Sequence, residues 1–145
     1  MIFQKYQIAL LWTCQLLFMT RVFGQVYVAF YAPAWLPPMD EWYSGLIPYP
    51  ILFDLQILTI LLMTKISWDN TCKRGYFYVT TSKAKSVLVV ISLIYFLIMA
   101  VRYVVTMFIF LERGWLGDTI PIFFHWVLAF YIYLITQDNR QMNHL

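Results

Sequence analysis

The sequence predicts an all-α integral membrane protein, a single domain of four transmembrane helices over residues 1–145. Hydrophobic residues make up 62% of the chain and charged residues only 12%, whereas a soluble domain carries about 25% charged residues. The mean hydropathy is correspondingly high, at +0.69. Four apolar segments are close to the roughly 20 residues that cross a bilayer as a helix, and backbone groups in lipid must form their hydrogen bonds within such a segment.

The spans are delimited by proline, glycine and capping residues. The first ends at the sequence PAWLPP, and Pro48 suits the opening turn of the second, where proline is tolerated. Asp118 and Thr119 offer a cap for the fourth, with Pro121 in its first turn. These signals predict spans over residues 7–32, 48–66, 86–111 and 119–136. The short connections leave no room for a soluble catalytic domain between them.

Basic residues gather between the second and third predicted spans, where Asp69 is the only acid. This cytoplasmic basic loop contains Lys65, Lys73, Arg74, Lys83 and Lys85. The terminal segments add Lys5 and Arg140. Because Lys and Arg are enriched in cytoplasmic loops, both termini are predicted to be cytoplasmic. The loop is expected to touch anionic lipid headgroups, or alternatively to dock an acidic partner protein.

Each predicted span carries one charged or titratable residue, and the four are Arg21, Asp54, Arg102 and His125. The helical rise places all four roughly 9–17 Å below the outer helix ends. Charges at such depths cost about 2.5–3.5 kcal/mol and usually face the bundle interior in pairs. Asp54 is therefore predicted to be the counter-ion of Arg21, Arg102 or both. Gln25, four residues after Arg21, is expected to extend this buried cluster.

The sequence leaves the role of the cluster open. Buried ion pairs often serve only to fix helix register and partner choice. With one acid and two arginines the cluster would carry a net charge of +1 with His125 neutral, which suits an anionic or carbonyl-bearing amphiphile such as a lipid headgroup, fatty acid or quinone. A metal site usually needs three or four converging donors, and His144 lies far away in the polar tail, so no metal is predicted.

These patterns favour a non-catalytic multi-pass membrane protein, an accessory or structural subunit of a larger membrane complex. The alternatives are the binding or enzymatic conversion of a small amphiphile at the cluster and, less favoured, a small transporter. The sequence contains no phosphate loop, zinc signature or haem-attachment motif, so no catalytic residue or cofactor is assigned. Membrane lipids and other membrane-protein subunits are the expected partners, and nucleic acid is not.

Overall fold

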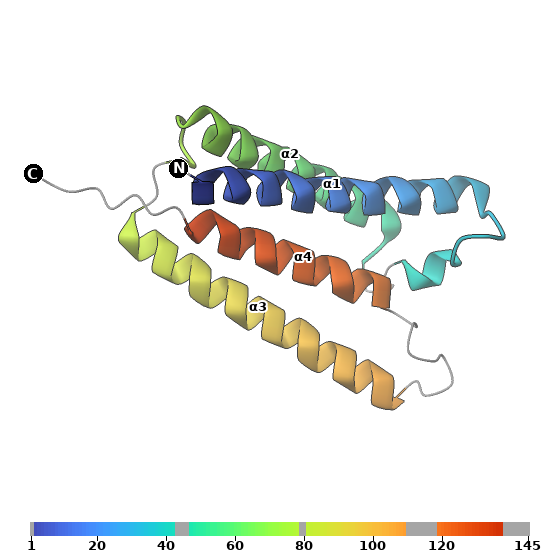
Figure 1. The fold of residues 1–145 in the computed structure, drawn as a ribbon. Coiled ribbons are helices and arrows are strands. Elements are labelled where there is room, and N and C mark those ends of the chain that lie inside the picture. The colour runs from blue at the N-terminus through green and yellow to red at the C-terminus, as the bar shows by residue number, and fades with distance from the viewer. Residues whose placement is uncertain (1, 43–46, 79–80, 110–118, 138–145) are drawn as a thin grey trace, which may run out of the picture.

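The computed structural model describes residues 2–42, 47–78, 81–109 and 119–137, and this part of the chain is helical with no strand (Figure 1). Its elements are α1 (Ile2–Tyr31), the short 3-10 helix η1 (Met39–Glu41), α2 (Tyr49–Cys72), α3 (Ser82–Ile109) and α4 (Thr119–Thr136). The predicted all-α bundle of four helices is confirmed. Arg140, His144 and the predicted Asp118 cap lie outside the described residues.

The helices α2, α3 and α4 are long and apolar enough to cross a membrane. The helix α1 is not among these three, although it contains 30 residues. Its hydropathy is lowered by polar residues, which include Lys5, Arg21 and the glutamines Gln4, Gln7, Gln15 and Gln25. Three membrane-crossing helices are thus supported by length and composition, and they agree with the predicted membrane location.

The helix α1 lies in the middle of the bundle. It packs against α2 on one side and α4 on the other, and α3 packs against α4. Figure 1 shows the resulting order, with α2 and α3 at opposite edges. Within α3 only Ser92 is fully buried, and its Oγ donates a hydrogen bond to the carbonyl oxygen of Ala129 at 2.8 Å. The outer surface of α3 is therefore almost entirely apolar and exposed.

The central position of α1 follows from a regular pattern of buried side chains. Alternate steps of four and three residues connect its buried positions, as in a heptad seam. These positions are Gln7, Leu11, Cys14, Phe18, Arg21, Gln25 and Val28. The seam thus combines apolar side chains with amides and one guanidinium, which explains how a helix of moderate hydropathy packs between two apolar helices.

Polar contacts connect α1 to its neighbours along its whole length. Trp12 Nε1 donates to Thr71 Oγ1 at 3.1 Å, and Gln15 Nε2 donates to Thr64 Oγ1 at 2.6 Å. On the α4 side, Gln7 Nε2 donates to the carbonyl oxygen of Leu134 at 2.7 Å. Interhelical hydrogen bonds of this kind contribute to helix association in lipid, where apolar burial adds little.

Asp69 organises the C-terminal end of α2. Its Oδ1 accepts an ion-paired hydrogen bond from Lys65, and its Oδ2 accepts one from the backbone N–H of Phe77 at 3.2 Å. The helix ends at Lys73, whose φ is 55°, and Gly75 follows with a φ of 114°. In the sequence Asp69 is only the single acid of the basic loop. In the structure its carboxylate holds the turn that follows α2.

Candidate functional site: a polar cavity between the four helices

A partly open cavity of about 160 Å³ lies in the bundle and draws its lining from all four long helices. Its polar lining residues are Arg21, Gln56, Thr59, Arg102 and His125. The remainder of the lining is apolar, including Phe18 of α1, Leu55 of α2 and Phe124 of α4. A concave, largely apolar site with a few converging polar groups is the usual form of a small-molecule site.

Arg21 is held in this wall by contacts that leave its charge without a carboxylate. The residue is only 7% exposed. Its Nη2 donates to the backbone carbonyl oxygen of Trp42 at 3.1 Å, and its guanidinium carbon lies 5.7 Å from the ring centroid of Phe124, within the range of a cation–π contact. Its Nε is buried and has no hydrogen-bond partner in the described part of the chain.

The contact with Trp42 depends on the turn η1, which packs over the C-terminal part of α1. The indole Nε1 of Trp42 donates to the carbonyl oxygen of Pro37 at 3.0 Å, which fixes the ring. The ring lies against Gly24, where a Cβ would come within 2.7 Å of Cη2. Glycine is therefore what allows η1 to approach α1 closely enough to present its carbonyl to Arg21.

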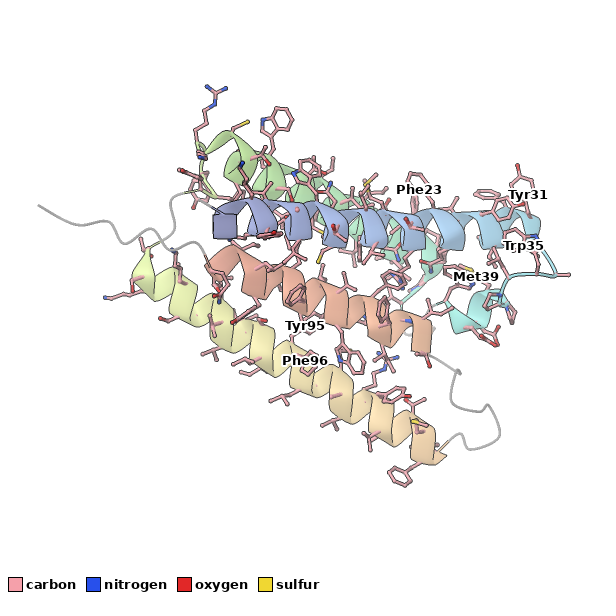
Figure 2. All side chains as sticks on the ribbon, viewed as in Figure 1. Phe23, Tyr31, Trp35, Met39, Tyr95 and Phe96 are labelled. Carbon is pink, nitrogen blue, oxygen red and sulfur yellow. The ribbon has the colours of Figure 1, made fainter. Side chains whose placement is uncertain are left out.

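His125 is positioned by α3. Its Nδ1 shares a hydrogen bond with the hydroxyl of Tyr95, and the two rings are edge-on with centroids 5.7 Å apart. Beside them, the rings of Phe96 and Trp126 have centroids 5.5 Å apart. Figure 2 shows Tyr95 and Phe96 on the side of α3 that faces α4. This aromatic contact sets the distance between the two helices and hence the place of His125 in the cavity wall.

Arg102 and Leu55 form the rim of the cavity. Arg102 is half-buried on α3, and Leu55 of α2 is 46% exposed. Among the described residues, the Arg102 guanidinium has no hydrogen bond or ion pair. The cavity is partly open, and its lining includes residues of both edge helices, α2 and α3, as well as of α1 and α4.

The structure thus brings Arg21, Arg102 and His125 together, but it does not bring Asp54 to them. Asp54 is exposed on the outward face of α2 and does not line the cavity. The prediction that it pairs with an arginine inside the bundle is wrong for the described residues, where the recorded ion pair is that of Lys65 with Asp69. Gln25, the fifth predicted member, is buried but lies behind the lining.

The residue that takes the inward position is Gln56, which the sequence analysis did not assign. It is 4% exposed, and its Nε2 donates to Gln25 Oε1 at 2.8 Å. Residues two apart on a helix point about 200° apart, so Asp54 and Gln56 cannot both face the core. A seven-residue repeat marks the buried face of α2 and identifies Gln56 as an inward residue. Its members are Gln56, Met63 and Asn70.

The cavity therefore differs electrostatically from the predicted cluster. It contains two guanidinium groups and no carboxylate among its lining residues, so its formal charge is +2 with His125 neutral. No group of three or more His, Cys, Asp or Glu side chains suited to a metal ion occurs in the described ranges. Such a site is built to attract hydrogen-bond acceptors and negative charge.

Comparison with known proteins adds no relative: no protein-family model, curated protein or solved structure matches this chain. A functional interpretation therefore rests on the geometry and charge of the cavity.

Proposed function

We propose that this chain is a non-catalytic membrane protein that binds a small amphiphile, with its polar head in the cavity and its apolar tail on the exposed apolar surface next to Leu55 of α2. The observation that supports this is a largely apolar, partly open cavity that contains two guanidinium groups and lies next to exposed apolar side chains such as Leu55. Lipid tails have direct access to such a surface, whereas a water-soluble ligand gains nothing from it.

Binding is favoured over conversion because the cavity offers no activated nucleophile. Such a nucleophile needs a base within hydrogen-bond reach. The hydroxyl of Thr59, the nucleophilic group of the lining, instead donates to the carbonyl oxygen of Leu55 at 2.8 Å. His125 is bonded to Tyr95 through Nδ1. The polar groups are therefore arranged to hold a ligand in place.

A tryptophan scan on two neighbouring leucines tests this proposal. Leu55→Trp narrows the rim of the cavity, whereas Leu58→Trp adds the same ring on the exposed outward face of α2, away from the lining. Native mass spectrometry of the protein from its own membrane should show a bound amphiphile in the wild type and in Leu58→Trp, and its loss in Leu55→Trp. A wild-type protein that carries no amphiphile would rule out the proposal.

A second candidate function, an accessory subunit of a membrane complex, is favoured by the position of Asp54. Ile51, Leu58 and Leu61 accompany it on the outward face of α2 and are 53–62% exposed. A carboxylate on a membrane helix normally pairs with a cationic group. We propose that this face meets a membrane helix of another chain that carries a Lys or Arg at the same depth.

We also propose a membrane topology for the chain, in which α1 is a fourth membrane-crossing helix. With 30 residues, α1 is about 45 Å long at the helical rise, which exceeds the roughly 30 Å hydrocarbon core of a bilayer. It packs between α2 and α4, both apolar enough to cross. We infer that α1 also crosses and, from the distribution of Lys and Arg, that both termini are cytoplasmic.

A further inference from the structure

The charge of the cavity calls for a counter-ion that the described part of the chain does not supply. Asp54, the only acid in the predicted spans, points away from the bundle. The turn η1 carries Asp40 and Glu41 next to Trp42, but neither forms an ion pair with Arg21 among the described residues. Arginine cannot lose its proton in a protein, so the two positive charges of Arg21 and Arg102 persist.

Two buried polar atoms in the same wall also lack partners. One is Nε of Arg21 and the other is Oε1 of Gln56, and each residue is more than nine-tenths buried. The Oε1 and Nε2 atoms of the Gln56 amide are similar in shape and can be interchanged. Interchanging them still leaves one of the two atoms without a partner. Buried polar groups are almost always hydrogen-bonded in folded proteins. Both residues line the cavity, so the unpartnered atoms belong to side chains next to which a ligand would lie.

We propose that the head of the amphiphile is an oxyanion, a phosphate or a carboxylate, which bridges Arg21 and Arg102 and hydrogen-bonds to Gln56. This inference rests on the proposed function of the cavity and names the class of its ligand. A guanidinium presents a planar set of N–H donors that matches the paired oxygens of a carboxylate or phosphate. A neutral carbonyl, as in a quinone, accepts one or two of these bonds but offsets neither charge.

The roles of the two arginines differ. Arg21 is fixed by Trp42 and Phe124, so it presents its N–H groups from a rigid position. Arg102 stands on the rim, half-buried, with no contact in the described chain that the ligand must break. An anion that arrives along the apolar edge therefore meets Arg102 first and Arg21 deeper in the cavity.

Binding of defined probes to the purified full-length chain tests this inference. The probes are dioleoylphosphatidate, oleate, dioleoylglycerol and inorganic phosphate, each titrated and followed by native mass spectrometry. Dioleoylphosphatidate, oleate or both should bind at least about tenfold more tightly than dioleoylglycerol, because a hydrogen bond to a charged group is worth about one tenfold step or more. Inorganic phosphate should bind only weakly, since it lacks the tail.

Arg102→Gln should weaken binding of the anionic probes by about tenfold or more, and Arg102→Lys should weaken it less. Lys5→Gln is the matched control, because Lys5 is exposed near the start of α1, lies outside the basic loop, and its loss lowers the net charge equally. Equal binding of dioleoylglycerol and dioleoylphosphatidate, with no effect of Arg102→Gln, overturns the oxyanion while leaving an amphiphile site. Binding of inorganic phosphate alone overturns the amphiphile function but supports the anion, and binding of no probe overturns both.

Discussion

Arg21 donates a hydrogen bond from Nη2 to the backbone carbonyl oxygen of Trp42 at 3.1 Å. This bond joins the wall of the cavity to the turn η1. The position of the turn therefore controls the position of the Arg21 guanidinium, which we propose to bind the ligand. Trp42 is in turn seated on Gly24. The fit between ring and glycine is the feature of this arrangement that mutation can test most directly.

Gly24→Ala is expected to have opposite effects in two backgrounds. In the wild type the new methyl group meets Cη2 of Trp42 at 2.7 Å, so the ring must move and the melting temperature should fall. In a Trp42→Leu background the obstacle is gone, and alanine should stabilise the helix by up to about 1 kcal/mol relative to glycine. Thermal unfolding in detergent measures both. An equal gain in both backgrounds would show that the ring does not rest on Gly24.

The amide pair of Gln25 and Gln56 should behave as a coupled unit. Changing Gln56 alone to Leu leaves the buried amide of Gln25 without its partner and should cost about 1 kcal/mol of unfolding free energy. The double change of both residues to Leu should cost less than the sum of the two single changes, since no polar group remains unsatisfied. A double-mutant cycle measured by denaturant unfolding decides this, and strictly additive energies would contradict the contact.

Asp54→Asn should leave the stability of the isolated chain unchanged within about 0.5 kcal/mol, as is usual for an exposed site. A buried counter-ion would behave differently, because its removal would strand a cation in the bundle and destabilise it strongly. In native membranes the same variant should reduce co-purification of partner subunits, whereas Asp40→Asn, an exposed acid of η1, should not. A large drop in the melting temperature of the isolated chain would instead show that Asp54 is a buried counter-ion.

The helices were predictable because lipid imposes a strong constraint on composition, length and backbone bonding. The depth argument predicted Arg21, Arg102 and His125 at one level, since rise per residue depends only on helical geometry, and all three line one cavity. Gln25 was found by its four-residue spacing from Arg21 and is buried as expected. These predictions concern the position of a residue along the helix axis, which follows from its position in the sequence.

It was harder to predict which face of each helix points to the bundle interior, and Asp54 shows why. The rule that intramembrane charges face inward assumes that the single chain is the whole environment. On α2 the inward face is instead chosen by Gln56, Met63, Ser67 and Asn70 together, which outweigh one acid. Trp42 and Tyr95 were missed for another reason: their contacts with Arg21 and His125 join segments far apart in the sequence, so no local spacing reveals them.

The turn after α2 offers a prediction outside the cavity. Gly75 has a φ of 114°, and a Cβ there would overlap the carboxyl group of Asp69. Gly75→Ala should therefore lower the unfolding free energy by about 1–3 kcal/mol, the usual cost of forcing a side chain into such a conformation. Lys73→Gly is the contrasting change, since its φ of 55° suits glycine better than lysine. If both variants melt alike, Asp69 does not hold the turn.

The topology can be tested through Cys72, which is the last residue of α2 and is half-buried, whereas Cys14 is buried in the core. A membrane-impermeant maleimide should label Cys72 only after the cells are permeabilised. In a Cys72→Ser background, Ala34→Cys, exposed between α1 and η1, should be labelled in intact cells. Lys5→Cys, exposed near the start of α1, should again require permeabilisation, because α1 is proposed to cross. Labelling of Lys5→Cys and Ala34→Cys from the same side would show that α1 does not span the membrane.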